Sequence, residues 1–557
     1  MMASRESAAI QPTPEPAAAT TRSSPLTRGV LVTVAALALV WFALSVPGPG
    51  PDVKVTASTP LHLPLEALGF LLVILAIPAR AERVRDGVAL TAGALLGALS
   101  VLRLLDIGFR EALGRPFNAV VDWGNVASGA SLLRDAVGWP LASAVVLIVA
   151  VLVVALLAGM PLAVQHVGRL VSRHRRGVLR ATTLLLAVWL LLTVADVRIG
   201  KSSIASMELA PYAYEELSSI PQGVRDQREF ARATADDPLA ATPTDRLLTA
   251  LRGKDVLFVF VESYGRVALE DPELSEGITI LLQSEGERLS TDGFSSRSAF
   301  LTSPTFGGIS WLAHSSFQSG LWVDSKQRYD ILLASERLTL SHAFNRAGWR
   351  TVVDVPANTA DWSRQGFYDY DQLYDSRNVG YEGPRFGYPT IPDQYTLEAF
   401  QRLELSAPER QPVMAEIDLI SSHAPWSPMP SIVPQDMIGD GSVYDDMPRS
   451  PAPSGAAETR KAYAASIEYS LGSVFAFLEA HGTDDTVLIF LGDHQPTSVV
   501  AGGDLGNDVP ISIVAKDPAI FERISSWGWE EGLLPGPEAP TWRMDSFRDR
   551  LITTFGS

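Results

Sequence analysis

The chain has 557 residues, of which 47% are hydrophobic and 19% charged, and it carries 45 Lys and Arg against 62 Asp and Glu, a net charge of −17. An acidic chain lacks the basic face that phosphate neutralisation needs, so the composition argues against nucleic-acid binding. The absence of cysteine excludes disulfides, thiolate zinc sites, iron–sulfur clusters and a cysteine nucleophile. The length suggests about two to four domains.

Charge and hydrophobicity are unevenly distributed along the chain. Residues 201–557 contain 28 basic and 51 acidic residues, a net charge of −23, which leaves a net charge of +6 for the first 200 residues. The long apolar runs are confined to those first 200 residues. The two parts are therefore expected to face different surroundings, and the low overall charge indicates membrane segments.

Five apolar runs in the first part are long enough to cross a bilayer, which takes about 20 residues per helix. The third run is rich in Gly and Ala and contains Arg103 near its end. The first run resembles a cleaved signal peptide, but it is long for one and other apolar runs follow, so we interpret it as a retained helix. The runs are Gly29–Val46, Leu63–Ala79, Gly87–Leu105, Pro140–Val164 and Val178–Val197.

Arginine residues mark the loops that are predicted to face the cytoplasm. Arg80, Arg83 and Arg85 crowd the link between the second and third runs, and further arginines crowd the link between the fourth and fifth. Five crossings then put the amino terminus in the cytoplasm and everything after Gly200 outside. The sequence therefore predicts a multi-pass protein of the plasma membrane with an extracytoplasmic C-terminal part.

The remaining segments complete the predicted organisation. Residues 1–28 are rich in Ala, Pro, Thr and Ser and are predicted to be a disordered cytoplasmic tail before the five-helix transmembrane region 29–200. Residues 201–250 carry helix-type patterning broken by Pro and Asp, which is typical of an extracytoplasmic linker. In residues 251–557 short β-rich runs alternate with amphipathic stretches, which predicts an α/β domain with a mostly parallel central sheet. The predicted strands are Val256–Val261, Thr351–Val355, Pro412–Leu419, Thr486–Phe490 and Val509–Ala515, and the predicted helices include Ser335–Arg346 and Glu458–Glu479.

Two of the predicted strands lead into residues that can bind a cation. Glu262 follows Val256–Val261, and Asp493 and His494 follow Thr486–Phe490 after a Leu-Gly step. Chemistry in such sheets lies beyond the carboxyl ends of the strands, so the three side chains can converge if the two strands lie close together. Two carboxylates and an imidazole suit Zn²⁺ or Mn²⁺. Each motif alone is also compatible with a helix cap or a solvated turn.

A turn rich in hydroxyl groups lies between the two motifs. It has the sequence FLTSPTFGGISW over residues 300–311 and precedes a helix-compatible stretch. A hydroxyl at a helix start can meet a metal while nearby backbone N–H groups favour an anion, and such a hydroxyl could attack phosphorus. In isolation, ordinary helix capping by Ser303 or Thr305 is the simpler interpretation. The hydroxyl-bearing residues of the turn are Thr302, Ser303, Thr305 and Ser310.

In chain order, the strand–Glu, Thr–turn–helix and Gly–Asp–His motifs resemble those of the lipoteichoic acid synthase-like phosphotransferases, which have a sulfatase fold and belong to the alkaline phosphatase superfamily. The resemblance covers most of the chain, because members of that group also have five membrane helices followed by an extracytoplasmic catalytic domain. It implies one divalent metal ion, with Mn²⁺ favoured and Zn²⁺ or Mg²⁺ as alternatives, held by Glu262, Asp493 and His494. It also implies a threonine nucleophile bound to the same metal, which maps to Thr305.

Two further elements of the family pattern are present. Trp362, Ser363 and Arg364 resemble the family's Trp-x-Arg, which contacts the phosphate group, and His423 stands in the context of a family histidine that binds the phosphate head group. Arg364 would offer a planar fork to phosphate oxygens, and His423 could donate a hydrogen bond or a proton. Taken alone, these residues would be assigned to surface or packing roles, and Trp362 equally to the core.

The sequence also departs from the family pattern. The turn around Thr305 is less polar than in most synthases of the group, which makes Ser303 a rival nucleophile. No Cys or Ser stands in the (C/S)-x-P-x-R order that sulfatases need, so hydrolysis of sulfate esters is disfavoured. The lack of cysteine also disfavours the phosphoethanolamine transferase branch, which commonly uses disulfides. Outside these motifs, we interpret His314 as packed against the sheet and Asp393 as part of a solvated turn.

The resemblance implies a membrane-anchored phosphotransferase that moves a phosphoglycerol-type group from a membrane phospholipid to a cell-envelope glycolipid, polymer or glycan through a phospho-threonine intermediate. One alternative is a phosphodiesterase, phosphatase or sulfatase-family hydrolase of the same fold, with water as the acceptor. A second alternative is an envelope protein that binds ligands without catalysis. The chemically competent residues at Glu262, Thr305, Asp493 and His494 argue against the second alternative.

Overall fold

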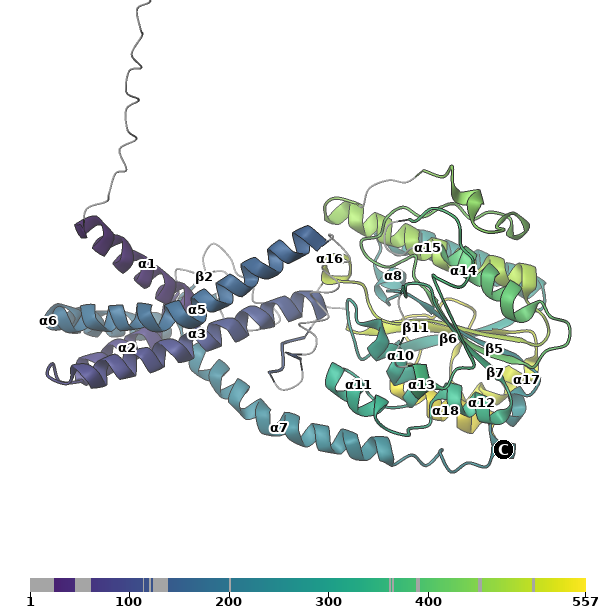
Figure 1. Cartoon of the computed structure of the whole chain (residues 1–557), viewed down its shortest axis with the longest axis horizontal. Helices are drawn as coiled ribbons and strands as arrows, with labels where there is room; N and C mark the ends of the chain where they lie inside the picture. The colour runs from purple at the N-terminus through teal and green to yellow at the C-terminus, as the bar shows by residue number, and fades with distance from the viewer. Residues whose placement is uncertain are drawn as a thin grey trace, which may run out of the picture. The chain divides into compact units, whose positions relative to one another are not determined.

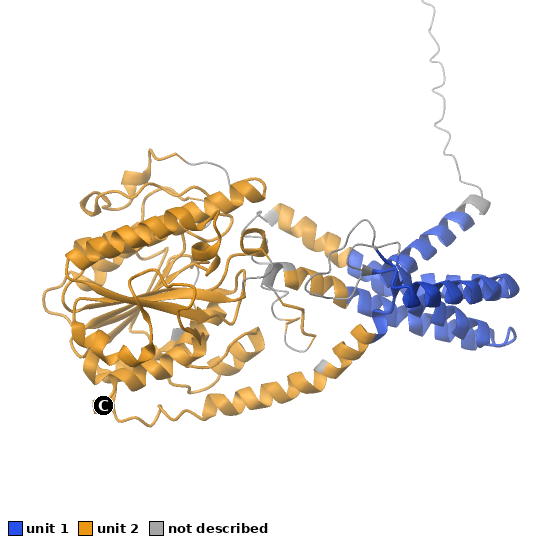
Figure 2. Cartoon of the chain, turned by 180° about the vertical axis from the view of Figure 1, so that it is seen from behind, with its two compact units in different colours: residues 1–48, 54–101, 152–210 blue, residues 49–53, 102–151, 211–557 orange. Residues whose placement is uncertain are grey.

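The chain, for which we obtained a computed structural model, divides into two compact units (Figure 2). One unit comprises residues 1–48, 54–101 and 152–210, and the other residues 49–53, 102–151 and 211–557. Of the tail predicted at 1–28, residues 1–24 lie outside the part that the structure describes, and Pro25 already begins a helix. The structure describes residues 25–45, 62–113, 115–119, 122–123, 139–199, 202–359, 362, 365–386, 391–448, 453–502 and 506–557.

A helix lies at each of the predicted apolar runs (Figure 1). Among the residues that the structure describes, three helical segments are long and apolar enough to cross a membrane, namely Glu82–Arg110, Pro140–Arg173 and Arg175–Val194. The other two apolar helices, Gly29–Ser45 and Leu65–Ala76, are shorter, so the five crossings remain a prediction. The helices are α1 (Pro25–Ser45), α2 (Leu65–Ala76), α3 (Glu82–Leu113), α5 (Trp139–Arg173) and α6 (Arg175–Val194).

The glycines of the third apolar run have a packing role. A Cβ atom at Gly93 would lie 2.5 Å from the Cα atom of Pro161, and one at Gly97 would lie 2.8 Å from the backbone oxygen of Leu156. Helices α3 and α5 therefore approach each other closely at these two positions. Small residues commonly permit such close approach between helices in a membrane.

A nine-stranded sheet forms the centre of the α/β domain (Figure 1). Its strand order is β12-β6-β11-β10-β5-β9-β7-β8, and β13 pairs with β6. From β10 to β8 all neighbours are parallel, whereas β11 is antiparallel to both β10 and β6, so the sheet is mixed. The strands are β5 (Asp255–Val261), β6 (Ser295–Thr302), β7 (Arg350–Val355), β8 (Gln372–Asp375), β9 (Val413–Leu419), β10 (Thr486–Gly492), β11 (Asp508–Ala515), β12 (Glu530–Glu531) and β13 (Thr541–Arg543).

Helices cover both faces of the sheet, because its central strands are apolar on both faces. Every residue of β5 is buried: Val259 packs in the core on one face, and Phe258 and Phe260 pack in the core on the other. The predicted helix Glu458–Glu479 lies within α15. The helix predicted to begin at Ser335 begins instead at Leu340, where the Thr339 side chain caps it. The first core includes α9 (Ser275–Thr291), α14 (Asp393–Phe400) and α15 (Ala456–His481), and the second includes α10 (Ser310–Ser319), α12 (Leu340–Ala347) and α18 (Phe547–Phe555).

Helix α7 (Leu209–Ala235) occupies much of the segment 201–250 that was predicted to be a linker. Two short 3-10 turns then lead to β5. Leu247 and Leu251 belong to the core beneath the sheet, where each is at most 1% exposed. The packed core of the α/β domain thus begins slightly before the predicted boundary at residue 251.

Candidate functional site

The two strand ends that carry cation-binding residues are neighbours. Strands β5 and β10 are parallel, and Val261 pairs with Gly492, so the residues that follow, Glu262 and Asp493, leave the sheet side by side. A Cβ atom at Gly492 would lie 1.9 Å from the backbone oxygen of Tyr264, so the close approach of the two segments requires glycine at this position. The convergence expected from the sequence therefore occurs in the structure.

Glu262, Asp493 and His494 form a compact, buried cluster. The Nε2 atom of His494 lies 3.3 Å from Glu262 Oε1 and 3.4 Å from Asp493 Oδ2, and each side chain is at most 9% exposed. The three ligand atoms all lie within 4.8 Å of one another. Ligands at about 2.0–2.2 Å from a Zn²⁺ ion lie roughly 3 Å from each other. The donor set and its spacing therefore fit one divalent cation.

Hydrogen bonds orient the ligand atoms of this cluster. Asp493 Oδ1 accepts from the backbone N–H groups of Ser263 (2.7 Å) and His494 (2.8 Å), which leaves Oδ2 toward the cluster. His494 Nδ1 lies 2.8 Å from the backbone oxygen of Gln495, which can only accept, so Nδ1 carries the proton. Nε2 is then the atom that can bind a metal, which is the usual arrangement for a metal-binding histidine.

The buried charges of the cluster shift one another's pKa. Burial, together with the Glu262 carboxylate, raises the pKa of Asp493 to about 6. Burial by itself would lower the pKa of His494, but Asp493 and Glu262 raise it to about 9. Burial would raise the pKa of Glu262, but the positive charges of His494 and His423 hold it well below its usual value. The site therefore favours positive charge at its centre.

Two hydroxyls contact this cluster: Ser263 Oγ donates to Glu262 Oε1 (2.9 Å), and the other belongs to Ser310, the first residue of α10. The Ser310 hydroxyl is the one that also lies near His494. Its Oγ atom donates to Glu262 Oε2 (3.0 Å) and lies 3.2 Å from His494 Nε2. The preceding residue, Ile309, has a left-handed backbone with φ of 64°. This conformation follows two glycines and turns Ser310 toward the cluster at the positive end of the helix dipole.

The two hydroxyls proposed from the sequence have other contacts. Thr305 Oγ1 donates to the backbone oxygen of Gly308 (2.7 Å), which closes the turn. Ser303 Oγ donates to the backbone oxygen of Asp493 (2.6 Å) and is fully buried. Ser303 therefore holds the turn against the end of β10, and Thr305 stabilises the turn itself. Sequence reasoning included Ser310 among the hydroxyls of the turn but did not select it, because its contacts depend on the left-handed residue before it.

Of the three residues expected to contact the phosphate group, the structure describes Trp362 and His423. The Trp362 side chain stacks on Tyr368, with ring centroids 5.6 Å apart, and Arg364 lies outside the described residues. His423 follows Ser422, whose hydroxyl donates to the backbone oxygen of Glu262 (2.5 Å). His423 is thus on a segment bonded to the cluster, and its charge acts on Glu262.

A second polar cluster lies one helical turn further along α10. The His314 ring stacks on Phe260 with centroids 4.0 Å apart, as expected for a residue packed against the sheet. Its Nδ1 atom also lies 2.8 Å from Glu416 Oε1 and 3.5 Å from Asp418 Oδ1. The other oxygen of Glu416 accepts from the Tyr370 hydroxyl at 2.9 Å. The sequence did not predict these ionic contacts, because Glu416 is 102 residues away from His314.

Asp393 is fully buried, so its assignment to a solvated turn is wrong. Its Oδ1 atom accepts from the backbone N–H groups of Ile420 (2.8 Å) and Ser421 (2.9 Å), and its Oδ2 atom accepts from the Ser470 hydroxyl (2.6 Å). The physical reason is that the turn after β9 has buried N–H groups that need an acceptor. Asp393 therefore positions the segment that leads to His423.

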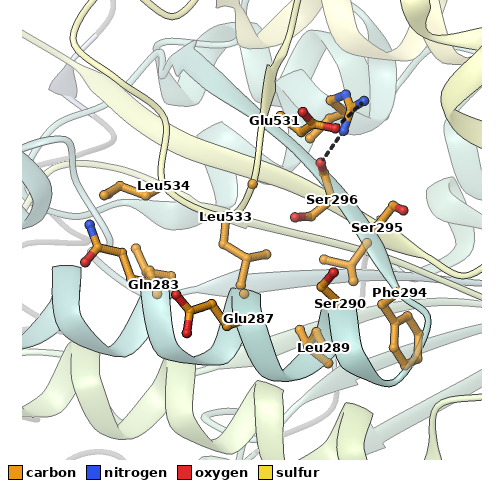
Figure 3. A pocket seen from close by; sticks show the side chains of 15 residues that line it. Gln283, Glu287, Leu289, Ser290, Phe294, Ser295, Ser296, Glu531, Leu533 and Leu534 are labelled. Carbon is orange, nitrogen blue, oxygen red and sulfur yellow. Dashed lines mark hydrogen bonds and ion pairs between the residues drawn. The ribbon is translucent and has the colours of Figure 1, made fainter.

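A pocket of about 690 Å³ lies elsewhere in the domain, between α9 and strands β6 and β12 (Figure 3). Leu282, Phe294 and Leu533 are among its apolar lining residues, and Arg297 and Glu531 form an ion pair of 3.1 Å. It lies at the amino-terminal end of β6, whereas the hydroxyl-rich turn follows the carboxyl end of the same strand. The pocket is therefore distinct from the buried cluster.

Comparisons with known proteins found one family model and several solved structures that resemble this chain. Residues 254–508 match the family model described as Sulfatase. One similar solved structure is the lipoteichoic acid synthase LtaP from Listeria monocytogenes, with 16% identity over 56% of this chain and 76% of that chain and a TM-score of 0.35. A second is the Streptococcus pyogenes phosphoglycerol transferase GacH in complex with sn-glycerol-1-phosphate, with 12% identity over 60% of this chain and 91% of that chain and a TM-score of 0.36. A third is the C-terminal periplasmic domain of EptC from Escherichia coli in complex with Zn, with 13% identity over 53% of this chain and 80% of that chain and a TM-score of 0.35.

The family match covers the strand, the turn and the Asp-His pair that build the cluster. Residues 254–508 of the α/β domain are thus similar to the Sulfatase family. The resemblance to sulfatase-fold proteins, which the motifs predicted, is confirmed. No curated protein matches the chain.

Proposed function

We propose that the protein is a membrane-anchored, metal-dependent phosphotransferase that moves a phosphoglycerol-type group from a phospholipid to a cell-envelope glycolipid, polymer or glycan. One observation carries the proposal: a serine hydroxyl at a helix N-terminus lies 3.0 Å from Glu262 Oε2 and 3.2 Å from His494 Nε2, within a buried carboxylate–histidine cluster. Such a cluster combines a nucleophile with the ligands of the cation that would activate it.

Glu262, Asp493 and His494 would hold one divalent cation, with Mn²⁺ favoured and Zn²⁺ or Mg²⁺ as alternatives. Bound there, the cation would lower the pKa of a neighbouring hydroxyl and offset the charge of a phosphate. The backbone N–H groups at the start of α10 point to the same place and favour an anion. Arg364 and His423 are proposed to bind the phosphate oxygens, and Trp362 to line their site.

The sequence motif and the side-chain contacts indicate different residues as the nucleophile. The motif maps it to Thr305, whereas the contacts favour Ser310, because the Thr305 hydroxyl donates to Gly308. We therefore propose Ser310 as the attacking group and retain Thr305 as the alternative. The hydroxyl oxygen forms a bond to phosphorus, the bond to the diacylglycerol oxygen breaks, and that oxygen takes up a proton. The hydroxyl of the acceptor then attacks phosphorus, the bond between phosphorus and the side-chain oxygen of the nucleophile breaks, and that oxygen takes up a proton, which regenerates the free hydroxyl.

Three single substitutions in the full-length protein test the assignment, namely Ser310→Ala, Thr305→Ala and Ser303→Ala. We expect Ser310→Ala to lower the release of diacylglycerol from phosphatidylglycerol about 10³-fold or more, because loss of a nucleophile removes the covalent route. Thr305→Ala should retain turnover and a trapped adduct that mass spectrometry locates on Ser310. The reverse pattern would assign the nucleophile to Thr305. Full activity in all three variants would refute a covalent hydroxyl intermediate.

Product analysis separates the proposed transfer from hydrolysis by the same site. Transfer predicts an acceptor that gains a phosphoglycerol unit, whereas hydrolysis predicts free glycerol phosphate.

Metal content tests the alternative that the protein binds ligands without catalysis. The wild-type protein should retain Mn²⁺ or Zn²⁺ on dialysis and Glu262→Gln should lose it, whereas equal metal content in both would favour a binding protein.

A further inference from the structure

Helix α7 has one face that packs on the α/β domain. Phe230 and Thr234 are 6% and 5% exposed. Phe230 lies in an apolar cluster with Leu312, and Asp226 forms an ion pair with Arg328. At 100° per residue these positions of α7 lie on one side of the helix. This side of α7 is therefore covered by other residues of the same chain.

The opposite face of α7 is apolar and exposed. Tyr214, Leu217, Ile220 and Val224 are 74%, 69%, 44% and 37% exposed. At 100° per residue the other three lie within about 60° of Leu217, so the four form one stripe. Single exposed apolar residues are ordinary, but a continuous stripe on a soluble surface indicates a partner.

The stripe continues as a basic surface. Arg228 and Arg232 are exposed and lie about 20° and 60° from Leu217 around the helix. An apolar stripe that contains a tyrosine and is followed by arginines is typical of a helix that lies in a membrane interface.

The first turn of α7 is bonded to the apolar helices. Glu66, in the first turn of α2, accepts from the backbone N–H groups of Leu209 (2.9 Å) and Ala210 (3.3 Å). Leu209 packs against the apolar cluster of those helices. The Tyr212 hydroxyl donates to Asp106 in α3 at 2.8 Å. The start of α7 therefore lies beside segments that a membrane would enclose.

We propose that the exposed face of α7, formed by Tyr214, Leu217, Ile220 and Val224 and continued by Arg228, lies on the lipid surface of the membrane that the apolar helices cross. The occupant is the bilayer itself, because the first turn of α7 is hydrogen-bonded to α2 and α3. The arginines face anionic head groups at the same surface. The inference does not depend on the proposed chemistry, since it concerns a face outside the catalytic cluster.

The absence of cysteine permits a direct test, because a single introduced cysteine can be labelled uniquely. Leu217→Cys and Val224→Cys place a fluorophore on the stripe, and Ile280→Cys is a matched control, since Ile280 is an apolar residue 60% exposed on α9. The full-length protein is reconstituted in phosphatidylcholine vesicles that contain phosphatidylglycerol and brominated lipids. We expect at least about twofold stronger quenching at positions 217 and 224 than at 280. Equal quenching at the three positions would overturn the proposal.

A second arm tests the head-group contact. The double variant Arg228→Gln/Arg232→Gln, carrying the label at position 217, should lose the gain in quenching that phosphatidylglycerol produces over phosphatidylcholine alone. An unchanged gain would show that the arginines do not contact anionic lipid. Because the readout is fluorescence quenching, loss of activity in a nucleophile variant would leave it unaffected, so this inference and the proposed function fail separately.

Discussion

At the scale of single residues, His314 is held between two carboxylates in the interior of the domain. Burial by itself would lower the pKa of His314, but Asp418 and Glu416 raise it to about 10. An unpaired buried carboxylate costs several kcal/mol, so the protonated ring stabilises the folded state. With an unfolded pKa of about 6.5, this stabilisation is fully present below pH 6.5 and is lost as the pH rises toward 10.

We therefore predict that His314→Gln lowers the thermal midpoint of the α/β domain at pH 6 and that the difference from wild type shrinks steadily up to pH 10. Each unit of pKa shift corresponds to about 1.4 kcal/mol, so the effect should be measurable. Tryptophan fluorescence of the full-length protein in detergent reports the transition. His342→Gln serves as the control, because His342 on α12 lies 3.4 Å from a more exposed carboxylate, that of Asp369. A difference that stays constant with pH would contradict the ionic role.

The sequence predicted those site residues that can be recognised from their immediate neighbours in the chain. Glu262, Asp493 and His494 were selected because each directly follows a hydrophobic strand. Ser310 was not selected, because the four hydroxyl-bearing residues of the turn look alike in the sequence until the backbone of the turn determines which of them reaches the cluster.

At the scale of secondary-structure elements, Asp393 joins three of them. It lies at the start of α14, accepts from the turn after β9 and accepts from Ser470 on α15. Burial raises the pKa of Asp393 to about 6, although the hydrogen bonds oppose this shift. In the core, this carboxylate satisfies two backbone N–H groups of the turn leading to His423.

Asp393→Ala should lower the free energy of unfolding, because each buried N–H group left without a partner costs about 1–3 kcal/mol. Asp393→Asn keeps one oxygen that can accept from Ile420 and Ser421, so it should be affected less. The thermal midpoint and the release of diacylglycerol are to be compared between the two variants. Equal effects of Ala and Asn on both would argue against a positioning role for the acceptor oxygen.

The elements that sequence patterns predicted are the apolar ones. The five predicted strands correspond to β5, β7, β9, β10 and β11. Strand β6 was missed because its sequence, SSRSAFLT, begins with polar residues and is buried only toward its end. The edge strands β8, β12 and β13 are short, and their pairing rather than their composition defines them.

At the scale of the whole molecule, the membrane arrangement can be tested by the same single-cysteine strategy. Five crossings with a cytoplasmic amino terminus predict that Glu82→Cys, at the start of α3, reacts with an impermeant maleimide only after cells are permeabilised. Ile432→Cys, at a position 42% exposed in the α/β domain, should react in intact cells. The opposite pattern would reverse the orientation, and reaction of both in intact cells would contradict an odd number of crossings between them.

The sequence by itself determined the division into a basic apolar part and an acidic α/β part, the main strands and the three residues of the cluster, because charge, hydrophobic periodicity and strand ends are properties of short segments. Only the tertiary structure decided that β5 and β10 are neighbours, which brings Ser263 and Asp493 together across 230 residues. It likewise decided that Ser310 contacts the cluster, that His314 has two carboxylate partners and that α7 has one packed and one exposed face. These features depend on which distant segments pair, and pairing is set by the packing of the whole domain.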